Sequence, residues 1–126
     1  MDFVSLSKSR HFLDAKPVRV PVFDRPRLAA ELVCLVPEQK ETRRNQEICD
    51  ELYVVIEGTG SLRSGSTVQE LEPSDAVVVP PGVERTLVNT GSTPLTVLVA
   101  LSPKPSFANQ SSPGTFYAVG SEEPAP

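Results

Sequence analysis

Between Val18 and Ser102 the chain consists of short apolar runs that are separated by turn residues. The runs are about five to ten residues long and are bounded by Pro, Gly, Ser, Asp or Asn, which is typical of strands joined by turns. No long stretch repeats its apolar residues at the helical period. The predicted strands are Val18–Phe23, Leu28–Val36, Glu51–Glu57, Ser61–Arg63, Thr67–Leu71, Ala76–Val79, Arg85–Val88 and Leu95–Leu101. Many short strands at this spacing predict an all-β sandwich, jelly roll or closed barrel.

One of these runs has the character of a strand inside the fold. Glu51–Glu57 is apolar at five consecutive positions between two acidic ends. A strand with one face in water would alternate apolar and polar residues instead. We therefore expect this run to form a central strand, with Glu51 at its start inside the fold.

The pattern also divides the chain into three parts. With 126 residues the chain is long enough for one domain with one hydrophobic core. We expect a lead segment over residues 1–17, the stranded core over 18–102 and a tail over 103–126. Five prolines and several serines interrupt the tail, which leaves little room for regular structure. Within it, Phe116 and Tyr117 of Thr115–Val119 either pack on the core or on a second subunit, or belong to a mobile tail.

Charge and composition narrow the expected partners and location. The formal net charge is −4 and the sequence pI is about 5.0, and the twelve Lys and Arg residues are scattered, so we expect no nucleic-acid partner. No stretch approaches the ~20 apolar residues that span a bilayer, and the N-terminus lacks a secretory signal. We therefore expect a cytoplasmic protein without membrane contact, in which Cys34 and Cys49 are reduced thiols.

Two short motifs occur within the stranded part of the chain. In the first, DELYVVIEGTG, Glu51 and Gly58 are separated by six residues, which is similar to the end of the first motif of the cupin family. The second motif reads SDAVVVPPGVERTLVN, where Ser74 replaces the first Gly of the family pattern. The positions that match the second motif are Pro80, Gly82 and Asn89. The resemblance implies an all-β double-stranded β-helix, which is the jelly-roll barrel of cupins.

The resemblance also implies that the usual metal ligands are missing. Metal-binding cupins carry a His-x-His pair before the first-motif Glu, and these two positions are Arg44 and Gln46 here. The third histidine position is Arg85, so that only Glu51 matches a family ligand. Arginine offers hydrogen-bond donors and a positive charge but no lone pair to a cation. We therefore expect no bound metal and no cofactor.

If the loop before Glu51 differs in length from that of the family, the His-x-His pair aligns in an alternative frame. In that frame the pair falls on Asn45 and Glu47, which together with Glu51 would supply oxygen ligands. A site of this kind favours Mg²⁺ or Mn²⁺, but the neighbouring arginines would repel either cation.

The side chains that the resemblance directs to the barrel interior form a candidate ligand site. They are Arg44, Gln46, Glu51, Tyr53, Arg85 and Leu87. Two interpretations stay open for this set. In the first, Glu51 neutralises one arginine and the cavity is plugged by a structural ion pair. In the second, two arginines against one glutamate leave a surplus positive charge that recognises a small anionic molecule.

Three functions are consistent with these residues, and no catalytic residue is assigned. The first is metal-independent binding of a small anionic or polar metabolite in the barrel. The second is a metal-free isomerase or cyclase-like activity that uses Glu51 and Tyr53. The third is a dimeric scaffold with a filled barrel. In each case we expect a homodimer, because Leu28–Val36 and Leu95–Leu101 are apolar on both faces.

The remaining histidine and the cysteines carry no predicted chemistry. His11 precedes the first predicted strand, so we expect a surface or packing role. Cys34 lies in an apolar run and is expected to be a small core residue. Cys49 has no histidine nearby in the sequence to activate it as a nucleophile.

Overall fold

The structure, a computed structural model, describes residues 1–44 and 48–104. Within them the chain forms one short helix and nine strands, and the helix is α1 (Leu6–Ser9). The strands are β1 (Val18–Asp24), β2 (Ala29–Leu35), β3 (Lys40–Arg44), β4 (Asp50–Glu57), β5 (Gly60–Ser64), β6 (Thr67–Leu71), β7 (Ala76–Val79), β8 (Glu84–Asn89) and β9 (Leu95–Ser102). No helix in these residues is long and apolar enough to cross a membrane.

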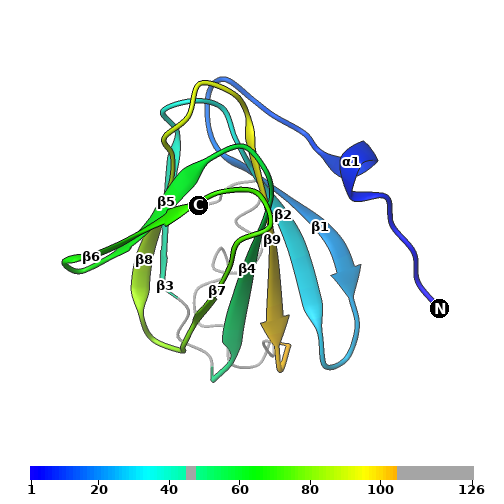
Figure 1. The fold of residues 1–126 in the computed structure, drawn as a ribbon. Helices are drawn as coiled ribbons and strands as arrows, with labels where there is room; N and C mark the ends of the chain where they lie inside the picture. The colour runs from blue at the N-terminus through cyan, green and yellow to red at the C-terminus, as the bar shows by residue number, and fades with distance from the viewer. Residues whose placement is uncertain (45–47, 105–126) are drawn as a thin grey trace.

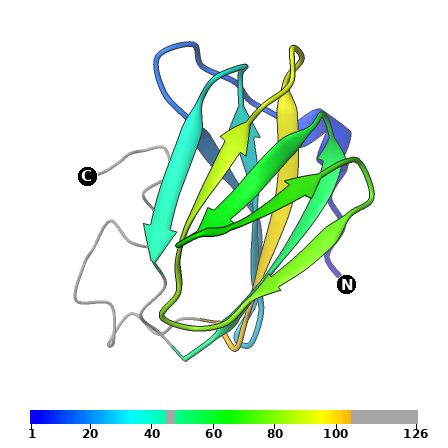
Figure 2. The same ribbon diagram turned by 60° about the vertical axis from the view of Figure 1, so that its left-hand side comes forward.

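The strands form two antiparallel sheets that lie against each other as the two walls of a barrel (Figures 1 and 2). The five-stranded sheet has the order β1-β2-β9-β4-β7, and the four-stranded sheet has the order β3-β8-β5-β6. This confirms the predicted all-β double-stranded β-helix. Strand β4 pairs with β9 on one side and β7 on the other, so its prediction as a central strand is also confirmed.

Eight of the nine strands agree with the predicted runs to within one residue at each end, but β3 was missed. Its sequence is Lys-Glu-Thr-Arg-Arg, which contains no apolar residue from which to read a period. Its burial nevertheless alternates, with Glu41 and Arg43 partly buried between exposed neighbours. Strand β3 is therefore an ordinary half-buried strand whose inward positions hold charged side chains.

The hydrophobic core lies between the two sheets and is built by alternation along each strand. Inward side chains on β2, β4, β9 and β8 meet there, and all of those that follow are buried. The core contains Ala29, Val33, Leu35, Cys49, Tyr53, Val55, Leu62, Leu71, Val79, Leu87, Leu95, Val97, Val99 and Leu101. Charged side chains take up the inward positions that these residues leave.

Residues at the motif positions perform structural tasks. Gly58 has φ 85°, and a Cβ at this position would collide with the backbone carbonyl of Pro94. Ser74 has φ 78°, so it adopts the left-handed conformation that suits the glycine of the family pattern. Asn89 donates from Nδ2 to the carbonyl oxygens of Leu35 and Thr93, both at 2.9 Å. These positions hold the turns of the barrel in place.

The N-terminal segment covers part of the outer face of the five-stranded sheet. Leu6 and Phe12 pack on a second buried cluster formed by Val18, Leu32 and Cys34. This contact explains why β2 is apolar on both faces, since its outer side is buried by the chain's own N-terminus. The outer face of β2 therefore does not support the expectation of a dimer, which rested partly on it.

Candidate functional site

Strands β4 and β8 bring together three of the predicted site residues inside the barrel. The Arg85 guanidinium forms a buried ion pair with Glu51 and donates from Nε to the Tyr53 hydroxyl at 2.9 Å. The Tyr53 hydroxyl donates in turn to Glu51 Oε1 at 3.4 Å. The guanidinium carbon lies 5.8 Å from the centre of the Tyr53 ring. The three side chains are buried and close a triangle of polar contacts.

A second group of charged residues, which the sequence analysis missed, lies beside this triangle. Arg19 on β1 donates from Nη1 to Glu31 Oε1 on β2 at 2.6 Å. It also binds both carboxylate oxygens of Glu41 on β3 at 2.8 Å, through Nε and Nη2. Because β1 and β3 belong to different sheets, Arg19 ties the two walls of the barrel together.

Arg43 connects the two groups. It lies directly opposite Arg85 in the β3–β8 pairing, and its Nη1 is 3.7 Å from Glu41 Oε2. We call the resulting set the central cluster, which comprises Arg19, Glu31, Glu41, Arg43, Glu51, Tyr53 and Arg85. Its three arginines and three glutamates balance in charge when all are ionised. Among the described residues, the surplus positive charge expected at this site is therefore not found.

The pKa of Glu31 and the pKa of Glu41 are shifted in opposite directions, because burial raises a carboxylate pKa and nearby arginines lower it. Burial raises the pKa of Glu31, and the Arg19 guanidinium offsets this only in part. Burial also acts to raise the pKa of Glu41, but Arg19 and Arg43 outweigh it and hold that pKa below its usual value. Glu31 Oε2 is buried and has no hydrogen-bond partner among residues 1–44 and 48–104. One carboxylate of the central cluster thus retains an acceptor that the described side chains do not use.

The tyrosine is held in its protonated form. Burial raises the pKa of the Tyr53 hydroxyl, and the lowering effects of Arg19 and Arg85 are smaller. The hydroxyl therefore remains a hydrogen-bond donor at neutral pH, and it also accepts the bond from Arg85.

The other predicted site residues do not all lie inside the barrel. Leu87 is buried in the core two residues after Arg85, on the same face of β8. Arg44 was expected in the interior, and this is wrong. Because side chains alternate along β3, Arg44 is exposed on the outside while Arg43 takes the inward position. Gln46 and the alternative pair Asn45 and Glu47 lie outside the described residues.

The missed residues had a signal in the sequence. Arg19 stands between two valines and Glu31 between apolar neighbours, in runs that otherwise read as buried strands. A lone charge in such a run either faces water or requires a buried partner. Because the partner of Arg19 on β3 is distant in the sequence, the pairing itself could not be predicted.

The residues at the positions where metal-binding cupins carry their ligands do not suit a divalent cation. Arg85 stands where the resemblance places a histidine, and it occupies the carboxylate of Glu51. In the described part of the chain, no group of three or more His, Cys, Asp or Glu side chains is arranged to hold a metal. His11 lies in the N-terminal segment and not in the central cluster.

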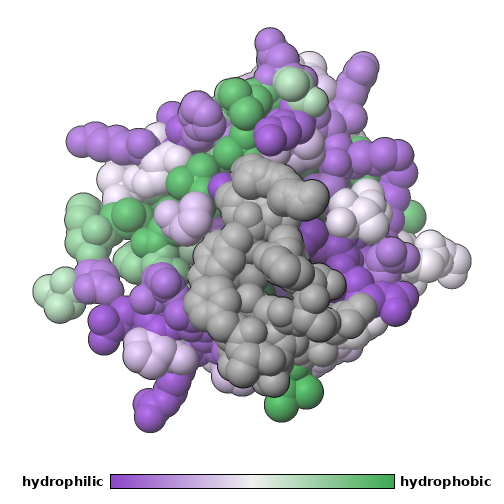
Figure 3. Space-filling model, turned by 180° about the vertical axis from the view of Figure 1, so that it is seen from behind, coloured by the Kyte–Doolittle hydropathy of each residue, from purple (hydrophilic) through white to green (hydrophobic). Residues whose placement is uncertain are grey.

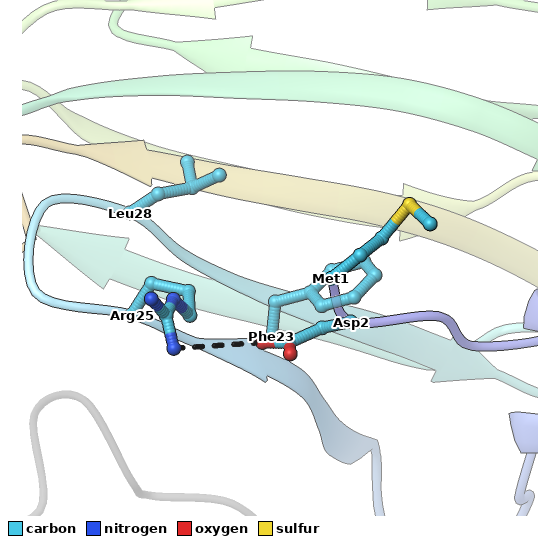
Figure 4. A pocket seen from close by; sticks show the side chains of 5 residues that line it. All are labelled: Met1, Asp2, Phe23, Arg25 and Leu28. Atoms are coloured by element: carbon cyan, nitrogen blue, oxygen red, sulfur yellow. Dashed lines mark ion pairs between the residues drawn. The ribbon is translucent and has the colours of Figure 1, made fainter.

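A pocket on the outside of the barrel is separate from the central cluster. It is lined by the N-terminus and the β1–β2 turn, and Arg25 Nη1 lies 3.9 Å from Asp2 Oδ2 across it (Figure 4). Its lining residues are Met1, Asp2, Phe23, Arg25 and Leu28. None of the predicted site residues lines this pocket.

Two facing antiparallel sheets with motif turns at Gly58, Ser74 and Gly82, and a charged cluster beside the apolar core, define a double-stranded β-helix protein. The family model of the Cupin domain matches residues 31–101, and the chain belongs to this family. Among curated proteins there is no match.

Several solved structures are similar to this chain. TT1209 from Thermus thermophilus is 28% identical, with a TM-score of 0.77 and coverage of 83% of this chain and 100% of that one. An RmlC-like cupin protein from Desulfovibrio desulfuricans is 20% identical, with a TM-score of 0.74 and coverage of 82% and 97%. KdgF from Halomonas sp. is 19% identical, with a TM-score of 0.70 and coverage of 84% and 96%. The last two likenesses show the fold alone.

Proposed function

We propose that this cupin is a metal-independent protein that binds a small polar molecule at the central cluster. The observation that carries the proposal is that six charged side chains and a tyrosine lie inside the barrel, at positions where apolar side chains would also pack. Replacing buried ion pairs by well-packed apolar residues is often neutral or stabilising, so such clusters are weakly explained by stability. Groups of titratable residues with shifted pKa values concentrate instead at functional sites.

The composition of the central cluster favours a ligand with both hydrogen-bond donors and acceptors. Guanidinium groups suit a carboxylate, phosphate or hydroxyl oxygen, and a ligand that binds Arg85 would take the place of one of its bonds to Glu51, Tyr53 or Val83. Glu31 Oε2 presents an acceptor without a partner among the described residues. Because the arginines and glutamates balance, the argument for a strongly anionic ligand is weaker than the sequence indicated. A polar molecule with at most one acidic group fits the cluster better.

A filled barrel is the second candidate, and one observation favours it. Glu51 and Arg85 are in direct contact, as expected of a structural plug with no room for a ligand between them. The protein would then act as a scaffold. The metal-free isomerase or cyclase-like activity stays a prediction, in which protonated Tyr53 would serve as the acid and Glu51 as the base.

Native mass spectrometry of freshly purified protein, combined with elemental analysis, tests the proposal. We expect a small molecule bound at about one per chain, without stoichiometric metal. Tyr53→Phe removes one hydroxyl from the central cluster and keeps the ring, so it should weaken retention of that molecule. Arg44→Met alters an exposed arginine on β3 and serves as the matched control, which should retain the molecule.

The filled barrel predicts a different result in the same experiment. Wild-type protein would carry neither metabolite nor metal, and thermal-shift screening against sugars, sugar acids, amino acids and nucleosides would find no stabilising compound. Tyr53→Phe and Arg44→Met would then behave alike in every binding assay. This combination of results would overturn the proposed function.

A further inference from the structure

One carboxylate of the central cluster, that of Glu31, uses only one of its two oxygens. Among the described residues, hydrophilic side chains cover much of the surface seen from behind, where water solvates their charges (Figure 3). Glu31 is only 1% exposed, so water does not solvate its carboxylate. Its Oε1 accepts from Arg19 Nη1 at 2.6 Å, whereas its Oε2 has no hydrogen-bond partner among residues 1–44 and 48–104. A buried polar atom of this kind requires a partner or a proton.

Glu31 and Tyr53 face the barrel interior from the same level of the five-stranded sheet. Glu31 on β2 pairs with Val99 on β9, and Val99 pairs with Tyr53 on β4. Glu31 alternates with the core residues Ala29 and Val33, so its side chain points inward. Neighbouring strands lie about 4.8 Å apart, so roughly 10 Å separates the backbones of β2 and β4. A group of a few atoms that lies over Val99 is therefore close to both polar side chains.

The net charge of the central cluster depends on the protonation of Glu31. Burial raises the pKa of Glu31 more than the Arg19 guanidinium lowers it, whereas the pKa of Glu41 is held below its usual value. Glu31 therefore accepts a proton before Glu41 as the pH falls. With that proton in place, three arginines face two carboxylates, and the cluster carries one surplus positive charge.

The ionisable groups around Glu31 lie on four other strands, and their charges set the conditions for a ligand. They are Arg19 on β1, Glu41 and Arg43 on β3, Glu51 and Tyr53 on β4, and Arg85 on β8. The core side chains of β2, β7 and β9 are apolar. An anion that enters while all of these groups are charged leaves a net negative charge in the barrel, which is costly in a buried site.

We propose that the central cluster binds a small monocarboxylate together with one proton, which Glu31 holds on Oε2. The ligand's carboxylate then replaces the charge that Glu31 gives up, so the occupied cluster stays neutral. Protonated Glu31 donates from Oε2 to a carboxylate oxygen of the ligand and still accepts from Arg19 at Oε1. The proton comes from the solvent, and no covalent bond of the ligand changes. This inference rests on the proposed function, because it names the ligand class and the proton coupling of the same site.

Proton uptake makes the affinity depend on pH with a definite sign. Below the pKa of Glu31 in the free protein the acid already carries its proton, so the affinity for the anion is constant. Above that pKa each binding event takes up a proton, and the affinity should fall by about tenfold per pH unit. A neutral ligand needs no proton, so its affinity should not follow this dependence.

NMR titration of the wild-type chain with formate from about pH 5 to pH 9 tests the inference. Formate is the smallest carboxylate, so it fits wherever a larger one is held, and with so few atoms it should bind in the millimolar range. On saturation the carboxyl carbon resonance of Glu31 should move toward its protonated position. Formamide has the same size without the charge and should bind without this pH dependence.

Glu31→Gln and Glu84→Gln form a matched pair of variants. A glutamine at position 31 keeps the size and donates an N–H where the protonated acid donates its O–H. This variant should bind formate equally at every pH, and about 100-fold more tightly than wild type at two pH units above the pKa of Glu31. Glu84→Gln makes the same change of charge at an exposed position beside Arg85 on β8 and should keep the wild-type pH dependence.

The wild-type titration and the Glu31 resonance keep the test decisive if Glu31→Gln fails to fold. Three outcomes would overturn the inference. They are no binding of formate at about 100 mM, an affinity for formate that does not change with pH, and a Glu31→Gln variant that keeps the wild-type pH dependence. The proposed function survives each of them as long as a neutral molecule binds at the central cluster. It fails together with the inference if neither a retained molecule nor any stabilising compound is found.

Discussion

Replacing Arg85 by methionine tests whether the central cluster depends on balanced charge. Methionine keeps the unbranched apolar stem but has no donor and no charge. The variant loses the ion pair to Glu51, the bond to the Tyr53 hydroxyl at 2.9 Å and the bond from Nη1 to the Val83 carbonyl at 3.0 Å. It leaves the Glu51 carboxylate in the barrel with only 4% of the residue exposed.

The expected loss of stability follows from this buried carboxylate, which no longer has a charged partner. Removing one partner of a buried ion pair costs about 3–5 kcal/mol, because the remaining charge is neither solvated nor paired. For a domain of this size that corresponds to a decrease in Tm of roughly 10–20 °C. Adding Glu51→Gln should recover part of the loss, since the amide is neutral and still bonds the Tyr53 hydroxyl. The double variant should therefore be more stable than Arg85→Met alone.

Urea denaturation and calorimetry of the two variants measure these free energies. Arg44→Met is the control, because it removes an arginine from the exposed side of the adjacent strand and should change stability by less than about 0.5 kcal/mol. The reasoning is refuted if Arg85→Met costs less than about 1 kcal/mol. It is equally refuted if the double variant is as unstable as the sum of the two single variants, since this would mean that the charges act independently.

Three further predictions concern other parts of the molecule. Because Arg19 and Arg43 hold the pKa of Glu41 below its usual value, its stabilisation is present above pH about 4.5 and is lost as pH falls through the lower folded-state pKa. Glu41→Gln should therefore flatten the loss of stability as the pH falls below about 4.5 in urea titrations, and an unchanged slope would contradict this. Elemental analysis of wild-type protein should find no stoichiometric Zn, Ni, Mn or Fe, and one tightly bound metal per chain would be contrary evidence. Phe12→Ala should open the cover over Cys34 and speed its modification by a thiol reagent, followed by peptide mass spectrometry, whereas equal rates in both proteins would show that Phe12 does not protect it.

The sequence by itself determined the strands whose positions are apolar and the turns between them. Burial in the core requires apolar residues at fixed alternation, so eight runs could be predicted with nearly correct ends. The turns could also be predicted from the sequence, because the left-handed φ at Gly58 and Gly82 depends on the type of a single residue. The cupin motifs added the connection of these strands into one barrel.

The interior of the barrel was decided by the tertiary structure. Strand β3 has no apolar pattern, and its inward Glu41 is paired because Arg19 on β1 donates to both of its carboxylate oxygens. A shift of one position along this strand exchanges the inward and outward side chains. The sequence therefore pointed to Arg44, while the β3–β8 register places Arg43 opposite Arg85. Local preferences set where the strands begin and end, but the partners of buried charges depend on contacts between residues that are distant in the chain.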